Sequence, residues 1–306
     1  MHIGENRIKE TKKEFKSGFI AVIGRPNVGK STLVNTIVGE KVAAVSNKPN
    51  TTRNRIKGIY NTNDCQMIFF DTPGIERARG KLQKSMVQAS LNSIDEADII
   101  IMVVDAARPF IKGDREIIKN VNEPVVLVLN KIDKIVKHEL LPIIERVKLF
   151  SEKISEIIPV CATKNNGIDT LKTVIQRKLP EGVRYFPDDI YTDQPEKFLV
   201  AEIIREKIFN LTKEEIPYKT AVMVEEFKEN TEKGIIRIAA TVLVERKSHK
   251  GIVVGKKGEM LKIVGSQARV EIESILGTKI FLELWVKVKE KWTENESLIR
   301  EIGYLN

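Results

Sequence analysis

The chain has 306 residues, of which 51 are lysine or arginine and 42 are aspartate or glutamate, so its formal net charge is +9. This length suits two domains, and the basic balance fits a nucleic-acid or other anionic partner without requiring one. Its two cysteines, Cys65 and Cys161, lie far apart, which excludes a zinc pattern or a disulfide framework, and no apolar run is long enough for a membrane span.

The N-terminal segment, residues 1–17, is highly charged, with three glutamates among its lysines and arginine. It has no apolar core of the kind that a signal peptide needs, and the glutamates argue against a transit peptide. We expect a frayed arm that precedes the first domain.

The first motif follows the apolar run Phe19–Ile23, which predicts a buried strand, and precedes 32–38, which predicts a helix ended by Gly39. Between them, GRPNVGKS has the spacing of the phosphate-binding loop of nucleoside triphosphatases. In this loop backbone N–H groups contact phosphates, the lysine charge meets the outer phosphates, and the serine hydroxyl ligates Mg²⁺. The expected contacts are Gly24, Arg25, Pro26, Asn27, Val28, Gly29, Lys30, Ser31 and Thr32.

The next polar stretch, KPNTTR at residues 48–53, lies before a strand predicted around Arg55–Tyr60. A threonine placed here can complete the Mg²⁺ shell only when a γ-phosphate is present. The spacing leaves Thr51 and Thr52 as alternatives for this role.

A second buried strand, Met67–Phe70, ends in the sequence DTPG. About 40 residues after a phosphate loop, this motif predicts a switch that senses the third phosphate. Asp71 would hold Mg²⁺ through water, and the Gly74 N–H would meet the γ-phosphate. We expect the following stretch, 75–84, to be mobile. The predicted nucleotide contacts here are Asp71, Thr72, Pro73, Gly74 and Ile75.

The base is expected to be read after the strands predicted at 99–104, 125–129 and 157–160. The N-K-x-D sequence that begins at Asn130 places a carboxylate where guanine offers two N–H donors and adenine does not. The predicted contacts are Asn130, Lys131, Asp133, Cys161, Ala162 and Thr163. The alternation of strands and helices over residues 18–179 predicts a doubly wound α/β domain with ligands at the carboxyl ends of its strands.

Residues 180–195 contain three prolines, a glycine and several acidic residues, a composition that predicts a flexible linker. A second, smaller α+β domain follows at 196–306. Helices are expected at 196–211, 248–254, 259–276 and 292–302, and strands at 221–227, 235–244 and 279–289. In the last strand we expect Trp285 to pack in the core.

The second domain contains a G-x-x-G sequence, 255–258, between two predicted helices, in the order of a type II KH domain. In that module the loop clamps the backbone of single-stranded nucleotides, and an adjacent apolar groove receives their bases. Six basic residues against one glutamate between 246 and 262 concentrate positive charge there. The candidate RNA contacts are Ile252, Val253, Val254, Gly255, Lys256, Lys257 and Gly258.

The nucleotide motifs together resemble those of translation-factor-related GTPases. Ile75 stands where Ras-like proteins carry a water-orienting glutamine, which implies slow intrinsic hydrolysis. Asn27 matches the asparagine with which related potassium-stimulated GTPases hold K⁺. The expected cofactors are therefore Mg²⁺ and K⁺.

The whole chain from about Gly18 to Leu305 resembles the Era family of bacterial ribosome-assembly GTPases, through GRPNVGKSTL, NTTR, AEIIREK, EIPY, LELWVKV and REIGYL. The resemblance implies a monomer in the cytoplasm that hydrolyses GTP, binds the 3′ end of 16S rRNA in the small ribosomal subunit and aids its maturation. It also implies stronger RNA binding in the GTP state and weak peripheral association with the inner membrane.

Related families keep a threonine only at the second position of the Thr51–Thr52 pair, so the resemblance favours Thr52 as the Mg²⁺ ligand. The implied catalytic residues are Lys30, Asn27 and Thr52. Two departures from the family pattern stand out. Cys161 replaces a serine, with little expected effect, and Val183–Arg184 replaces a proline-rich pair, which we expect to loosen the linker.

Four alternative functions have separate tests. A P-loop kinase for a small molecule disagrees with N-K-x-D, and its nucleotide preference would be ATP. A tRNA-modifying GTPase would share the first domain but end in a cysteine motif that is absent here. An RNA-binding scaffold with a vestigial nucleotide site would show no turnover. A membrane-associated signalling role stays open as the fourth alternative, and because the sequence shows no lipid anchor and no strongly amphipathic basic helix, its membrane contact would be peripheral.

Overall fold

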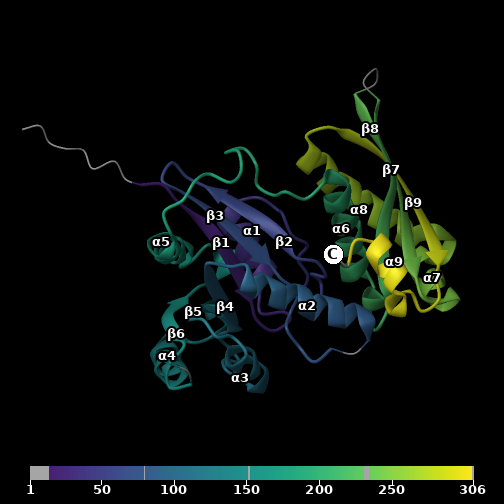
Figure 1. The fold of residues 1–306 in the computed structure, drawn as a ribbon. Coiled ribbons are helices and arrows are strands. Elements are labelled where there is room, and N and C mark those ends of the chain that lie inside the picture. Colours follow the sequence, from purple (N-terminus) through teal and green to yellow (C-terminus); the bar gives the residue numbers. More distant parts are fainter. Residues whose placement is uncertain (1–13, 79, 151, 231–233, 305–306) are drawn as a thin grey trace, which may run out of the picture.

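The computed structural model describes residues 14–78, 80–150, 152–230 and 234–304, so most of the predicted N-terminal arm lies outside the described residues. Two domains lie side by side, a first domain around a six-stranded sheet and a second around a three-stranded sheet (Figure 1). No helix among the described residues has the length and apolar character needed to cross a bilayer.

The first domain is built on a sheet of order β2-β3-β1-β4-β5-β6, in which only β2 runs antiparallel to its neighbour. The four inner strands arise from apolar runs that are largely buried on both faces, as parallel sheets require, whereas the edge strands β2 and β6 are only partly buried. The strands are β1 (Lys16–Ile23), β2 (Ile56–Asn61), β3 (Cys65–Asp71), β4 (Ile99–Asp105), β5 (Val125–Asn130) and β6 (Ile154–Pro159).

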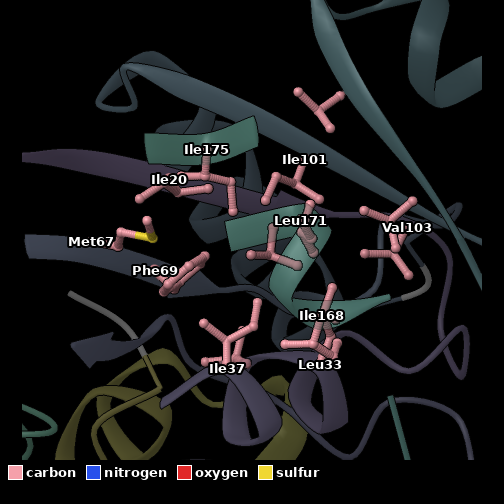
Figure 2. Packing of buried hydrophobic residues seen from close by; sticks show 14 of the residues in the cluster. Ile20, Leu33, Ile37, Met67, Phe69, Ile101, Val103, Ile168, Leu171 and Ile175 are labelled. Atoms are coloured by element: carbon pink, nitrogen blue, oxygen red, sulfur yellow. The ribbon is translucent and has the colours of Figure 1, made fainter. Parts of the chain in front are cut away.

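Helices cover both faces of this sheet, which confirms the doubly wound α/β class. They are α1 (Lys30–Val38), α2 (Lys81–Asp95), α3 (Lys112–Lys119), α4 (Leu140–Lys148) and α5 (Ile168–Lys178). Side chains of α1 and α5 interlock with β1, β3 and β4 on one face (Figure 2). Apolar residues of α3 and α4 fill the other face. Helix α1 ends where the sequence predicts, at a left-handed Gly39.

The segment between the domains, 180–195, is held against the first domain, so the prediction of a flexible linker is wrong. The buried Gln66 amide accepts hydrogen bonds from the Tyr185 and Phe186 N–H groups at 2.8 and 3.0 Å. The Ile59 N–H donates to the Tyr191 carbonyl at 2.8 Å. Proline-rich composition argues against regular secondary structure, but it does not argue against ordered packing.

Arg184, which was expected to loosen this segment, instead helps to fix it. Its guanidinium lies over the Phe15 ring at 4.8 Å. It also donates to the Thr62 carbonyl at 3.4 Å. Arg184 therefore holds this segment against the first domain.

The second domain is a sheet of order β7-β8-β9 with three helices packed on one face (Figure 1). Strands β7 and β8 are antiparallel, while β8 and β9 are parallel. This arrangement confirms an α+β KH domain of type II. Its elements are α6 (Glu196–Leu211), β7 (Thr220–Asn230), β8 (Ile235–Val244), α7 (Lys247–Val254), α8 (Glu259–Leu276), β9 (Lys279–Val288) and α9 (Glu296–Glu301).

Two expectations for the end of the chain are wrong. Trp285 does not pack in the core: it is 61% exposed, on the face of β9 opposite the helices, together with the 53% exposed Phe281. The predicted last helix is split, because the Asn295 side chain accepts a hydrogen bond from the Leu298 N–H and begins α9 there.

A small apolar cluster joins the two domains. Leu82 and Met86 of α2 pack with Trp292, Ile299 and Tyr304 at the C-terminal end of the described chain. Helix α2 starts at Lys81, inside the stretch expected to be mobile, so part of that stretch is packed helix.

Candidate functional site

The phosphate loop connects β1 to α1 at the carboxyl end of the central strand. Its backbone requires glycine: Gly29 has φ +97°, and a Cβ there would lie 2.3 Å from the Asn130 amide nitrogen. The Lys30 ammonium is buried and donates to the carbonyls of Gly24 and Arg25 at 3.1 and 3.0 Å. Burial lowers the pKa of Lys30 to about 8, a cost that the negative charge of a phosphate would offset.

Three oxygen-bearing side chains meet beside this loop. The hydroxyls of Ser31 and Thr52 are 2.8 Å apart, and the Thr52 hydroxyl donates to Asp71 Oδ2 at 3.4 Å. Burial raises the pKa of Asp71 to about 6. The hydroxyl of Thr51 points elsewhere, donating to the Lys48 carbonyl at 3.0 Å. Of the two threonines that the spacing left open, Thr52 therefore lies beside Ser31 and Asp71, and Thr51 does not.

This cluster fits a magnesium ion. Mg²⁺ prefers oxygen ligands and usually takes only one or two carboxylates together with phosphates and water. Asp71 Oδ1 is buried without a hydrogen-bond partner among the described atoms, as expected of an atom that faces a cation or its water. The described residues contain no cluster of three acidic, histidine or cysteine side chains that would form an all-protein metal site.

The two segments that the sequence predicts to sense the γ-phosphate, 48–53 and 71–74, line the same cavity as the phosphate loop. The Ile75 N–H donates to the Gly24 carbonyl at 3.1 Å, and Gly74 packs so tightly on Pro26 that a Cβ there would lie 2.5 Å from its ring. The sequence missed part of the opposite wall, which is formed by the segment before the threonines: Ala44, Val45, Ser46, Lys48 and Asn50.

The base-reading loops lie at the ends of β5 and β6. Asn130 ties them to the phosphate loop through a hydrogen bond from its amide nitrogen to the Val28 carbonyl at 2.9 Å. The Lys131 ammonium pairs with Asp105 at 2.8 Å, a residue that sequence reasoning did not include. Asp105 ends β4 beside β5, so the strand order brings it there.

Asp133 presents its carboxylate at the rim of this loop. A hydrogen bond from the Cys161 thiol, together with the charge of Lys164 at 3.5 Å, keeps the pKa of Asp133 below its ordinary value. The Ala162 N–H, which was expected to contact the base, donates to Asn130 Oδ1 at 3.2 Å in this structure.

Asn27 lies in the phosphate loop with a left-handed backbone, φ 66°. Its amide nitrogen donates to the Asn47 carbonyl at 2.5 Å, so the amide is oriented by the segment that precedes the switch threonines. This hydrogen bond uses the nitrogen, and the side-chain oxygen is then the atom that can face a cation.

The second candidate site is a groove in the KH domain. The G-x-x-G loop leads directly into α8, and its backbone needs glycine because a Cβ at Gly255 would lie 2.8 Å from the Met260 nitrogen. Lys256 and Lys257 are exposed at the tip. The groove of ≈ 400 Å³ continues along α8 and β9 and is lined by Gly258, Leu261, Lys262, Gly265, Ser266, Arg269, Leu282 and Leu284.

This groove differs from the predicted one in two respects. Val253 is fully buried in the core of the domain, so the prediction that it contacts RNA is wrong. Val254 is also packed against that core, whereas Ile252 is 49% exposed. Three consecutive apolar residues of a short helix cannot all face one groove. The opposite wall comes from β9, which no motif near the loop signalled.

Comparisons with known proteins match both domains. A family profile described as "50S ribosome-binding GTPase" matches residues 19–131, and a "KH domain" profile matches residues 215–293. GTPase Era of Geotalea uraniireducens is 53% identical over 96% of this chain and 99% of that protein. GTPase Era of Geobacter metallireducens is 50% identical over 95% and 98%.

Two crystal structures share the fold over 95% of this chain and all of the other, each with a TM-score of 0.93 and 42% identity. One is Era in complex with MgGDPNP and nucleotides 1506–1542 of 16S ribosomal RNA. The other is a variant of Aquifex aeolicus Era bound to GDP·AlF4⁻.

Proposed function

This chain belongs to the Era family of GTPases, and from that premise we propose that it binds 16S rRNA in its KH groove and acts in assembly of the small ribosomal subunit and rRNA maturation. The observation that carries the proposal is the full-length likeness to an Era seen with both a GTP analogue and the 3′ region of 16S rRNA. The nucleotide would be GTP or GDP, and RNA binding would be stronger in the GTP state.

Different residues would bind the phosphates, the guanine base and the magnesium ion. Lys30 and the backbone of the phosphate loop hold the phosphates, while Asp133 selects guanine. Ser31, Thr52 and Asp71 would hold Mg²⁺, which supplies charge to the β- and γ-phosphates when bound. Thr52, whose hydroxyl lies beside Ser31, would sense the third phosphate, because a γ-phosphate and its magnesium ion order such threonines in GTPase switches.

The direct test is to crosslink the protein to cellular RNA in the presence of a non-hydrolysable GTP analogue. Recovery of fragments from the 3′ end of 16S rRNA is the expected result. Recovery of tRNA instead would favour the alternative of a tRNA-modification-related GTPase. Absence of any RNA, with intact GTP hydrolysis, would favour a signalling role.

The finer properties belong to the same proposal. We expect a monomer in the cytoplasm, with at most peripheral contact with the inner membrane. Co-sedimentation with vesicles of bacterial lipids, in GDP and in the GTP analogue, measures that contact. If the protein stays in the supernatant in both nucleotide states, the expected membrane association is wrong.

We predict that GTP hydrolysis is faster in K⁺ than in Na⁺ at equal ionic strength. Asn27 offers an oxygen beside the phosphates, and Ile75 cannot orient water as a glutamine does, so a monovalent cation would supply the missing positive charge. Steady-state turnover in the two salts measures the effect, and Asn27→Ala should abolish the difference. Equal wild-type rates in the two salts would contradict a potassium site.

A further inference from the structure

Arg53 directly follows Thr52, the proposed γ-phosphate sensor, and its side chain is buried against the KH domain. Arg53 is 2% exposed, although an arginine is seldom buried. Its guanidinium donates to the carbonyls of Thr220 at 2.7 Å, Pro217 at 3.0 Å and Tyr218 at 3.1 Å, all in the KH domain. We call these three carbonyls, with the rings of Trp292 and Tyr304, the Arg53 socket.

The socket matches the shape of a guanidinium. Its carbonyls receive N–H groups from both ends of the planar fork, and the Trp292 and Tyr304 ring centres lie 5.7 and 5.4 Å from Cζ. Among the described residues, no carboxylate pairs directly with Arg53, and burial lowers its pKa. A buried charge that has no directly paired carboxylate is costly if any of these contacts is lost.

Thr52 and Arg53 are adjacent in the sequence, but their side chains contact different domains. The Thr52 hydroxyl reaches Ser31 and Asp71 in the nucleotide site, while the Arg53 side chain enters the KH domain. One peptide bond separates them, so neither can shift by several ångströms without moving the other.

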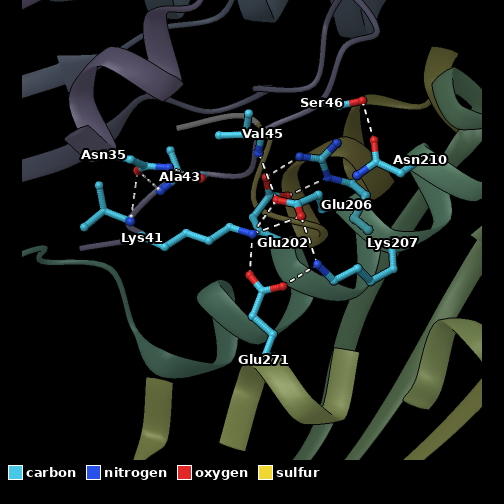
Figure 3. Close-up of polar contacts among 12 residues, drawn as sticks. Asn35, Lys41, Ala43, Val45, Ser46, Glu202, Glu206, Lys207, Asn210 and Glu271 are labelled. Atoms are coloured by element: carbon cyan, nitrogen blue, oxygen red, sulfur yellow. Dashed lines mark hydrogen bonds and ion pairs between the residues drawn. The ribbon is translucent and has the colours of Figure 1, made fainter. Parts of the chain in front are cut away.

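The rest of the same segment is also held by the KH domain (Figure 3). The Lys41 ammonium pairs with Glu206 of α6 at 2.8 Å and with Glu271 of α8. The Val45 N–H donates to Glu206 at 2.9 Å. The Lys48 ammonium contacts the last carbonyls of α6, where a positive charge also complements the helix dipole.

From these contacts we infer that Arg53 is a positioning residue for Thr52, so that the KH domain completes the γ-phosphate sensor of the GTPase domain. The inference rests on the proposed GTPase function and deepens it by naming the element that links the domains. When Arg53 fills the socket, Thr52 is held where a GTP-bound magnesium ion needs it. By linkage, GTP must in turn stabilise the docked arrangement of the two domains.

The test is Arg53→Gln in the full-length protein, compared with Arg53→Lys. Gln removes the charge and most of the fork, so Thr52 loses its fixed position. We expect the preference for a GTP analogue over GDP to fall by about 5- to 150-fold, the usual span of coupling between sites. The kcat should fall with it, whereas GDP affinity should stay unchanged, because GDP has no γ-phosphate for Thr52 to sense. Arg53→Lys should give an intermediate value.

Arg55→Gln is the matched control. Arg55 lies two residues further on and makes its contacts within the GTPase domain, with Glu96 at 2.6 Å and over the Phe70 ring at 4.6 Å. Its loss should leave the nucleotide preference near the wild-type value. A general weakening of the fold would lower GDP affinity in both variants, which distinguishes a structural role from positioning.

Lys41→Gln guards against misfolding of the Arg53 variants, because Lys41 is only partly buried, contacts the KH domain and does not line the nucleotide cavity. It should shift the GTP analogue to GDP ratio in the same direction by a smaller factor. Wild-type ratios in folded Arg53→Gln, or in Lys41→Gln if the former does not fold, would overturn the inference. Absence of GTP turnover in the wild-type protein would instead overturn the proposed function itself.

Discussion

Asp133→Asn is expected to shift the protein from guanine toward xanthine nucleotides. The carboxylate can accept from the ring N–H and the exocyclic amine of guanine, and the amide loses one charge-assisted acceptor while gaining a donor. Losing one hydrogen bond to a charged acceptor costs about 1.5–3 kcal/mol, and the unsatisfied donor that the amide places against a guanine N–H costs about 1–3 kcal/mol more, together roughly 10²- to 10⁴-fold in GTP affinity. Xanthine carries a carbonyl in place of the amine, which the new amide can meet.

Competition between GTP and XTP for the same site measures this shift. Asp169→Asn is the control, because Asp169 is an exposed carboxylate in the first turn of α5 and undergoes the same chemical change. The control should keep the wild-type preference. An Asp133→Asn variant that still prefers GTP to XTP would mean that another group reads the base.

The double substitution Lys256→Asp and Lys257→Asp is expected to abolish RNA binding and to leave GTP binding intact. Both lysines are exposed at the tip of the G-x-x-G loop, so the change reverses charge where the RNA backbone should lie. Lys257 already has a left-handed backbone, φ 51°, a conformation that aspartate tolerates well. The fold should therefore survive.

The same charge reversal at Lys119 and Lys148 controls for the change in net charge. These lysines are exposed on α3 and α4 of the GTPase domain. RNA affinity measured by fluorescence anisotropy at one salt concentration should fall only slightly in this control. Undiminished RNA binding by the Lys256 and Lys257 variant would move the RNA site away from this loop.

Local sequence signals were sufficient for most of the nucleotide site. The phosphate loop, Asp71 and Asn130 each follow a strand of consecutive apolar residues, and parallel strands bring their carboxyl ends to one edge. Each of these motifs could therefore be placed at that edge from the residues immediately before it. The ion pair of Asp105 with Lys131 could not be predicted, because it depends on which strand lies beside β5, and no motif marks the end of β4.

The errors fall where a residue's environment depends on distant parts of the chain. Both faces of β9 carry large apolar side chains, so alternation alone does not tell that the face with Trp285 is open and the face with Leu284 is packed. The partners of Arg53 lie more than 160 residues away in the sequence. Neither the linker contacts nor the Arg53 socket has a local signature.

The central claim is that the nucleotide sets RNA affinity through contacts between the switch segment and the KH domain. Helix α8 lines the RNA groove with Arg269 and pairs with Lys41 through Glu271, so the groove and the switch share one element. The most direct measurement is the affinity for an RNA of the 16S 3′ sequence with GDP and with a non-hydrolysable GTP analogue, at one salt concentration. We predict tighter binding with the analogue, by about 5- to 150-fold. Identical affinities in the two nucleotide states would contradict the account.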